Sequence, residues 1–151
     1  MKSNVILIFI VLVCFGCIIY YSYAVFFAPI EITAMQLEAP PHGSFECLGY
    51  SRGFAESWDI DMYISDGLVS LKMLLLSRPD HPVINLIAPG DGHYYTWRDR
   101  QVRGYVGTAA GNHFGNLDCV RRWNLAPTLF AVPPDIQFRS AAKLELLSLP
   151  Q

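Results

Sequence analysis

The feature that most constrains this chain is a long apolar run near its N-terminus. From Val5 to Phe27 the sequence contains no charged residue. This run is longer than the roughly 20 residues that an α-helix needs to cross the hydrocarbon core of a bilayer. A chain of 151 residues is too short to build a soluble core that would bury such a helix on every side. The run therefore predicts a membrane anchor over residues 1–27.

The charges that flank this run predict its orientation. Lys2 precedes the run, and the next Lys or Arg in the chain is Arg52. Because positive charge is retained on the cytoplasmic side, we expect a single-pass membrane protein with a cytoplasmic N-terminus and an extracytoplasmic domain, periplasmic in a bacterium. We favour an uncleaved signal-anchor helix. Cleavage after Ala24 and lipidation at Cys17 are alternatives that also leave the domain outside the cytoplasm.

Two cysteines, Cys47 and Cys119, lie beyond the apolar run, which contains the other two. A pair of cysteines in an oxidising compartment predicts a disulfide, and closing a loop of roughly 70 residues stabilises a fold by about 4 kcal/mol. The four histidines are scattered, and no Cys or His pair stands at metal-ligand spacing near them. We therefore predict no metal and no cofactor. Outside the anchor the charges nearly cancel, which argues against nucleic-acid binding.

The rest of the sequence divides into a linker and a domain. Residues 28–44 contain three prolines and predict a stiff linker that holds the domain off the membrane. Residues 45–151 have globular composition and predict one extracytoplasmic β-domain.

A hairpin is the clearest local structure predicted within this domain. Apolar and polar residues alternate from Asp59 to Ser65, the pattern of a half-buried strand. Asp66 and Gly67 suit a tight turn because both positions can adopt positive φ, and the alternation resumes from Val69 to Leu75. Turn signals recur about every ten residues along the domain. We therefore expect a mainly β fold, a small antiparallel β-barrel or sandwich with one disulfide.

Two later segments have weaker patterns. Glycine and asparagine dominate from Thr108 to Asp118, which predicts a long loop before Cys119. Residues 140–148 fit either a strand or a short helix, and we favour a strand because Leu144 and Leu146 alternate with charged neighbours.

Residues 49–53, Gly-Tyr-Ser-Arg-Gly, have the Gly-x-Ser-x-Gly spacing of a nucleophile elbow. Such an elbow needs a buried strand before the serine and a helix after it. The strand predicted from Asp59 follows too soon for that helix, and a hydrolase sheet needs more residues than this domain has. We interpret the two glycines as flanking a bend beside Cys47, and we expect the protein not to be an enzyme.

Charged side chains form two further groups. Glu56, Asp59, Asp61 and Asp66 are close in sequence, but the strand alternation points Asp59 and Asp61 to solvent. We interpret them as a solvated face rather than as the paired carboxylates of a glycosidase. The second group mixes arginine with tyrosine and tryptophan, a composition typical of interface hot spots: Arg98, Arg100, Arg103, Arg121 and Arg122 with Tyr94, Tyr95, Trp97, Tyr105 and Trp123.

Residues 45–119 resemble the C-type lysozyme inhibitor family, small periplasmic or membrane-bound bacterial proteins. Members carry a Ser-Gly-x-x-Tyr stretch and then a Lys-Gly-x-x-Ala stretch. The segment Asp91-Gly92-His93-Tyr94-Tyr95 keeps the glycine and tyrosine of the first, and Arg103-Gly104-Tyr105-Val106-Gly107 keeps the basic residue and glycine of the second. Three shorter matches are to the opening, a middle strand and the close: Phe45-Glu46-Cys47, Leu68-Val69-Ser70-Leu71-Lys72 and Asp118-Cys119. The resemblance implies an antiparallel β-barrel with a cysteine near each end.

In that family the serine and the lysine enter the lysozyme cleft and meet its catalytic carboxylates. The resemblance implies that Arg103 can take the place of the lysine and offer a charge-assisted fork to a carboxylate. Asp91 cannot replace the serine, because a third carboxylate close to two others is repelled. We expect a partner-binding surface that contains Asp91, His93, Tyr95, Trp97 and Arg103.

These observations predict a membrane-anchored extracytoplasmic domain that binds another protein rather than catalyses a reaction. The first hypothesis is an inhibitor of, or a protective protein against, lysozyme-like wall-degrading hydrolases. The alternatives are a subunit of an envelope assembly that docks through its transmembrane helix, and an immunity protein against an exported toxin.

Overall fold

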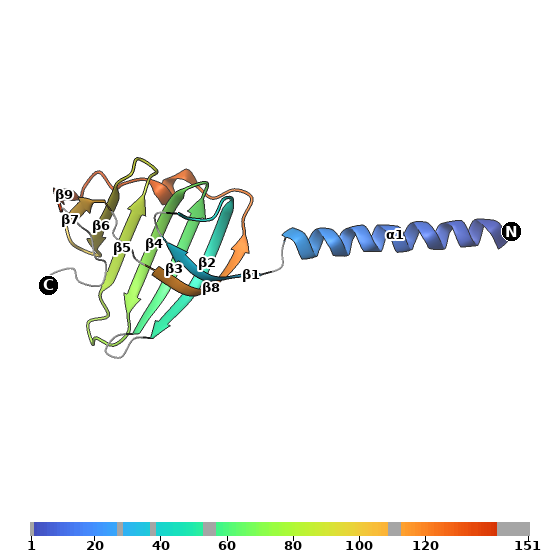
Figure 1. Ribbon diagram of the computed structural model, residues 1–151, viewed down its shortest axis with the longest axis horizontal. Coiled ribbons are helices and arrows are strands. Elements are labelled where there is room, and N and C mark those ends of the chain that lie inside the picture. The colour runs from blue at the N-terminus through green and yellow to red at the C-terminus, as the bar shows by residue number, and fades with distance from the viewer. Residues whose placement is uncertain (1, 27–28, 37–38, 53–56, 109–112, 142–151) are drawn as a thin grey trace.

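The computed structural model of the chain describes residues 2–26, 29–36, 39–52, 57–108 and 113–141. In these residues one long helix precedes a domain of nine strands and one 3-10 helix (Figure 1). The elements in chain order are α1 (Lys2–Phe26), β1 (Ile30–Gln36), β2 (Ser44–Arg52), β3 (Ser57–Ser65), β4 (Leu68–Leu75), β5 (Val83–Ala88), β6 (Tyr94–Arg98), β7 (Arg103–Gly107), β8 (His113–Arg121), η1 (Pro127–Phe130) and β9 (Gln137–Ser140). The domain is mainly β, as the sequence predicted.

All nine strands belong to one sheet, in the order β1-β8-β2-β3-β4-β5-β6-β7-β9. Neighbours are antiparallel except for β7 and β9, which pair in parallel. Within the described ranges β1 and β9 are the two edges of the sheet and do not pair with each other, so the sheet is open. The prediction of a closed barrel or of two packed sheets is therefore wrong, because the described strands form one open sheet. The parallel addition of β9 to β7 extends the sheet instead of joining its edges.

One side of the sheet forms the core, and we call it the inner side. Buried and more exposed positions alternate along β3 and β4, and residues paired directly across strands point to the same side. One row of such pairs crosses the core and is at most 2% exposed: Cys119, Cys47, Met62, Leu71 and Leu86. Phe130 of η1, which lies against β4, is also buried. The opposite side of the sheet is the outer side.

The predicted hairpin is confirmed as β3 and β4. Ser65 pairs with Leu68, and the two residues between them, Asp66 and Gly67, have φ angles of 46° and 92°. Both angles are positive, which a two-residue turn of this kind requires. Asp66 also accepts a hydrogen bond at Oδ1 from the Gly43 backbone N–H at 3.1 Å. The turn is therefore held to the start of β2.

β1 and most of β8 lie where the sequence predicted no strand. β1 occupies residues 30–36 of the segment interpreted as a linker, and it pairs with β8. β8 in turn includes residues 113–118 of the predicted long loop. β8 lies between β1 and β2 and pairs with both. Its register is set by partners that are distant in sequence, so its glycine- and asparagine-rich composition gave no local signal of a strand.

The end of the chain is described only in part. β9 ends at Ser140, and residues 142–151 lie outside the described residues. The strand or helix predicted over 140–148 is therefore untested beyond residue 141.

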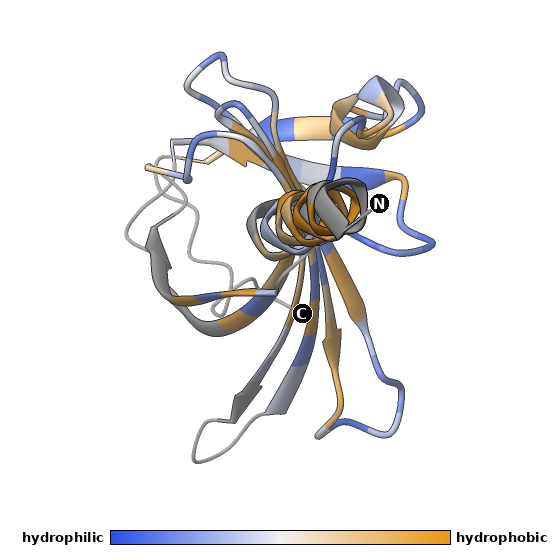
Figure 2. Cartoon of the chain, turned by 90° about the vertical axis from the view of Figure 1, so that its right-hand side faces the viewer, coloured by the Kyte–Doolittle hydropathy of each residue, from blue (hydrophilic) through white to orange (hydrophobic). Residues whose placement is uncertain are grey.

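Apolar side chains of α1 are exposed along its length. Phe9, Leu12 and Ile18 are 68%, 65% and 62% exposed, and Figure 2 shows the hydrophobic colouring of the helix. In the part of the chain that the structure describes, no helix is identified as long and apolar enough to cross a membrane. The anchor over residues 1–27 stays a prediction.

Candidate binding surface

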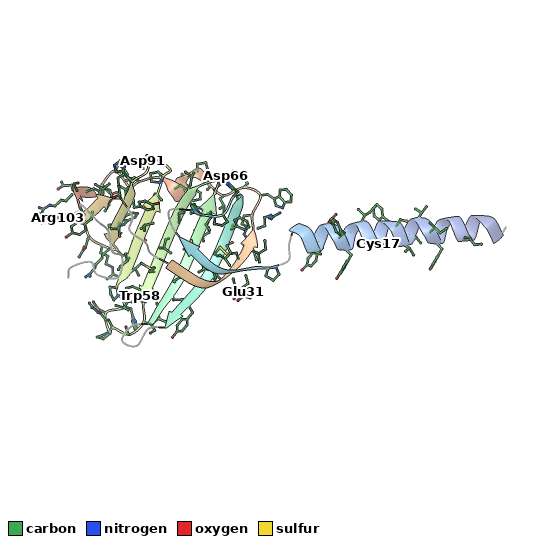
Figure 3. All side chains as sticks on the ribbon, viewed as in Figure 1. Cys17, Glu31, Trp58, Asp66, Asp91 and Arg103 are labelled. Atoms are coloured by element: carbon green, nitrogen blue, oxygen red, sulfur yellow. A yellow bond between two sulfur atoms is a disulfide. The ribbon has the colours of Figure 1, made fainter. Side chains whose placement is uncertain are left out.

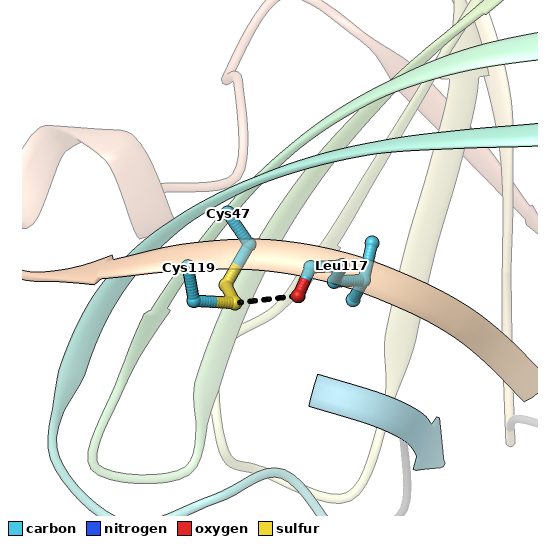
Figure 4. Close-up of a disulfide and its surroundings, with 3 residues drawn as sticks. All are labelled: Cys47, Leu117 and Cys119. Atoms are coloured by element: carbon cyan, nitrogen blue, oxygen red, sulfur yellow. Dashed lines mark hydrogen bonds between the residues drawn. A yellow bond between two sulfur atoms is a disulfide. The ribbon is translucent and has the colours of Figure 1, made fainter. Parts of the chain in front are cut away.

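The disulfide predicted from the sequence joins two adjacent strands. Cys47 of β2 and Cys119 of β8 stand directly opposite each other, with their Cα atoms 4.0 Å apart. Both side chains are fully buried. Figure 4 shows the bond beside Leu117, whose carbonyl oxygen lies 3.9 Å from the Cys119 sulfur. The disulfide closes 72 residues of sequence and fixes the register of β8, the strand that local sequence specifies least.

Three of the predicted contact residues meet at the turn between β5 and β6. Asp91 stands between Gly90 and Gly92, whose φ angles of 84° and 79° favour glycine. The Asp91 carboxylate accepts hydrogen bonds from the His93 backbone N–H at 2.9 Å and from the Tyr95 hydroxyl at 3.3 Å. Partial burial, together with the Asp91 charge and this hydrogen bond, raises the pKa of Tyr95. The Asp91 carboxylate therefore stabilises the turn in which it lies through these two hydrogen bonds.

Two of the three aromatic residues of β6 pack on the outer side of the sheet. Tyr95 and Trp97 both meet the Phe138 ring of β9 edge to face, with centroids 5.2 Å and 6.1 Å away. Such contacts stabilise by about 1 kcal/mol beyond simple burial. Gly104 lies between Trp97 and Phe138 in the pairing, and a Cβ there would come within 2.7 Å of the Phe138 ring. Sequence reasoning missed Phe138, because one aromatic residue in a four-residue strand carries little signal.

Arg103 lies on the opposite side of the sheet from Tyr95 and Trp97. In β7, Val106 pairs with Tyr95 and Gly104 pairs with Trp97. Residues in pairs share a side and neighbours along a strand alternate, so Arg103 points to the inner side. The five predicted contact residues therefore do not form one surface. Figure 3 shows Arg103 at the edge of the sheet that β7 and β9 form, and Asp91 in a turn away from it.

Arginine side chains gather around Arg103. Arg98 ends β6 directly after Trp97, and Arg103 begins β7 directly before Gly104, the partner of Trp97. Arg139 of β9 pairs with Tyr105 on the same inner side, and Arg100 lies in the turn between β6 and β7. We call these four residues the arginine face: Arg98, Arg100, Arg103 and Arg139. Among the described residues none of the four forms an ion pair or a side-chain hydrogen bond.

The other two arginines of the predicted cluster lie elsewhere. Arg122 pairs with Glu46, donating from Nε at 2.6 Å, and Arg121 lies over the Phe45 ring at 5.8 Å. Arg121 is the last residue of β8 and Arg122 comes directly after it. β8 lies next to the edge strand β1, far from β7 and β9 in the strand order. The structure therefore divides the predicted cluster, leaving Arg98, Arg100 and Arg103 together and adding Arg139, which the sequence analysis missed.

Asp59 and Asp61 lie on the outer side, as the alternation predicted, but only Asp59 is fully exposed to solvent. Asp59 is exposed, whereas Asp61 is half-buried and pairs with Lys72 in the sheet. Desolvation and the nearby Glu46 charge raise the pKa of Asp61, and Lys72 opposes them. Its Oδ1 atom is buried and has no hydrogen-bond partner in the described residues. Glu56 lies outside those residues, which contain no group of three His, Cys, Asp or Glu that could hold a metal ion.

Ser51 does not stand on a strand-to-helix turn. Residues 49–52 continue β2, and Ser51 pairs with Trp58 of β3. The bend predicted at these residues is wrong, and Gly53 lies outside the described residues. Gly49 has a packing role instead, because a Cβ at this position would overlap Cδ2 of the buried Leu117.

Comparison with known proteins identified no relative of this chain. No family model matches the chain, and no curated protein or solved structure is significantly similar to it. The resemblance to the C-type lysozyme inhibitors stays a prediction.

Proposed function

We propose that this protein is a membrane-tethered, extracytoplasmic domain that binds a protein partner, and that the partner is a lysozyme-like wall-degrading hydrolase. Residues 5–27 anchor it, which their lack of charge and the exposed apolar side chains of α1 support. The Cys47–Cys119 disulfide fits a domain in an oxidising compartment. No metal or cofactor takes part in this function.

The observation that carries the proposal is the position of Arg103 relative to the tether. α1 ends at Phe26 and β1 begins at Ile30, so three residues separate this helix from one edge of the sheet. Arg103 lies in β7, next to the opposite edge, and is exposed. A tether at one edge therefore leaves the other edge accessible to a partner.

The chemistry of Arg103 suits an acidic cleft. A guanidinium presents a planar fork of donors that can bind a carboxylate through two parallel hydrogen bonds. Asp91 is left out of this contact, because its carboxylate already accepts from His93 and Tyr95 and would be repelled by other carboxylates. His93, Tyr95 and Trp97 then support the turn and the outer side rather than touch the same partner surface.

The test is inhibition of muralytic enzymes by the full chain held in detergent micelles. A C-type lysozyme and a set of bacterial wall hydrolases are assayed with wild type and with Arg103→Ala. We expect wild type to inhibit at least one enzyme and Arg103→Ala to weaken inhibition by more than about 1 kcal/mol, roughly fivefold. Arg121→Ala, which removes an exposed arginine near the other edge, is the matched control. Absence of inhibition across the set would remove the hydrolase from the proposal.

A second candidate is a subunit of an envelope assembly that docks through α1. The exposed apolar side chains of α1 and the open space around Gly16 favour it, because small residues allow close approach of helices in a membrane. Replacing residues 2–26 by an unrelated anchor separates the two candidates. A tethered inhibitor keeps its activity, whereas an assembly subunit loses its partner. An immunity protein would use the Arg103 surface against a toxin instead, and differs only in target.

A further inference from the structure

We propose that the arginine face is a single binding site for an acidic protein surface, in which Arg98, Arg100 and Arg139 act together with Arg103. The inference rests on the proposed protein-binding function. It goes further by assigning three more arginines and by naming the chemistry that the partner must present, namely several carboxylates within a small area.

The geometry of the sheet places these charges close together. Arg98 ends β6 and Arg103 begins β7, each next to one residue of the Trp97–Gly104 pair, so the two arginines lie close together at this end of the hairpin. Arg103 pairs with Gln137 and Tyr105 pairs with Arg139, so Arg103 and Arg139 are diagonal neighbours, about 7–8 Å apart. Like charges this close repel each other. Carboxylates of a partner that bind among these arginines would attract each of them and offset their mutual repulsion.

Asp99 and Asp91, in the turns at the two ends of β6, form hydrogen bonds with groups other than these arginines. Asp99 accepts a hydrogen bond at Oδ1 from the Asn85 amide at 2.6 Å. Asn85 pairs with Trp97, so this contact lies toward the outer side. Asp91 accepts from His93 and Tyr95. In the described part of the chain, no carboxylate forms an ion pair with an arginine of this face.

The inner side of the sheet is exposed at this edge. On β3 and β4 the inner positions are buried, whereas on β7 and β9 the corresponding residues Arg103, Gln137 and Arg139 are exposed. Tyr105 is 36% exposed between them, and Val102 in the preceding turn is 66% exposed. The site is thus a continuation of the core-facing side that a partner can reach.

The mixture of residues favours a protein over an extended polyanion. Arginine and tyrosine are enriched in the few residues that carry most of the energy of protein interfaces. Arg98, Arg103 and Arg139 occupy three neighbouring strands, which lie about 4.8 Å apart, and Arg100 lies in the turn between the first two. The site is therefore compact rather than a track. The whole chain has a net charge of −2, which does not attract a polyanion at long range.

The test is a titration of the full chain in detergent micelles with a hexaglutamate peptide at low salt, followed by calorimetry. We expect binding that weakens at least about tenfold in Arg103→Gln/Arg139→Gln, since two charge-assisted forks are lost. Arg121→Gln should bind as wild type does. Arg103→Lys/Arg139→Lys, which keeps the charge and removes the fork, should give an intermediate affinity. Melting curves establish that each variant is folded, and both substituted arginines are exposed.

Three results would overturn the inference: no hexaglutamate binding at low salt, equal binding by wild type and the double Gln variant, or binding of tripolyphosphate without binding of hexaglutamate. The last result would assign the face to phosphate instead. The titration is independent of the muralytic assay. Hexaglutamate binding without inhibition of any hydrolase would retain the arginine face and reject the target. Inhibition that is unaffected by Arg139→Gln would reject the extended face and retain the target.

Discussion

Cys47 and Cys119 stand directly opposite each other on two hydrogen-bonded strands, with their Cα atoms 4.0 Å apart. Local pairing and a long-range covalent bond therefore specify the same register. β8 is the strand that benefits most, because it is inserted between β1 and β2 from a distant part of the sequence. Without the bond, its position would depend on backbone pairing and on Leu117 alone among its described core residues.

Removing the disulfide should lower stability substantially. For Cys47→Ala/Cys119→Ala we expect the free energy of unfolding to fall by about 4 kcal/mol, the loop-entropy value for a 72-residue closure. Urea unfolding followed by tryptophan fluorescence measures the change. Cys14→Ala/Cys17→Ala, which changes the two cysteines outside the domain, is the control. A loss below about 1 kcal/mol would show that strand pairing alone fixes β8.

The outer side offers a test based on the charge of Asp61. Its raised pKa means that the folded state holds the Asp61 proton more tightly than the unfolded state, whose value is near 3.8. The stabilising effect is therefore present below that value and is lost as pH rises through the folded pKa. At neutral pH the ionised, half-buried carboxylate with an unpartnered Oδ1 destabilises the fold.

Asp61→Asn should accordingly raise the melting temperature at pH 7 and change it little at pH 3. The measurement is a pair of melting curves for wild type and variant at several pH values between these limits. Asp59→Asn removes the same charge from an exposed neighbour on the same strand and should change the melting temperature less. A lower melting temperature for Asp61→Asn at pH 7 would mean that the carboxylate has an attractive partner.

The first glycine of the Gly-x-Ser-x-Gly sequence should prove to be a packing residue. A Cβ at Gly49 would overlap Leu117, which is fully buried and cannot move into solvent. We expect Gly49→Ala to destabilise the fold by about 1–3 kcal/mol through overpacking. In a Leu117→Ala background the same substitution should cost less, because the overlapping side chain is gone. Equal costs in both backgrounds, measured by urea unfolding, would remove Leu117 as the cause.

Sequence alone specified the parts of the fold that depend on neighbours along the chain. The β3–β4 hairpin could be predicted because alternation and the Asp66-Gly67 turn act within a few residues. β1 and β8 could not, since their pairing joins residues more than 70 positions apart, such as Ile30 with Cys119. The disulfide could be predicted from the number of cysteines and the expected oxidising compartment. The adjacency of its two strands could not be predicted.

The residues of the binding surface could likewise be grouped from the sequence only where they are close along the chain. The sequence placed Arg103 and Trp97 in one cluster because they are close in the chain. Strand alternation and the pairing of Trp97 with Gly104 put them on opposite sides of the sheet. Arg139 joins Arg103 only because β9 adds in parallel beside β7. A parallel pairing leaves no turn signal between its two strands, so no local pattern predicted this neighbour.

The arginine face should also affect stability in a salt-dependent way. Arg98 and Arg103 follow and precede the paired residues Trp97 and Gly104, and neither forms an ion pair in the described structure, so we expect that removing one charge relieves repulsion. We expect Arg103→Gln to raise the free energy of unfolding by about 0.5 kcal/mol at low ionic strength. The gain should shrink at high salt, because exposed charges are screened over a shorter distance.

Urea unfolding at two salt concentrations measures this difference. Arg121→Gln, which loses the contact with the Phe45 ring instead of a repulsion, should give no gain at either concentration. If Arg103→Gln lowers stability at low salt, Arg103 has an attractive partner and the face is not an unsatisfied positive site. A salt-dependent gain would mean that the fold retains a repulsion among its own arginines, which is the expected property of a surface that binds an acidic partner.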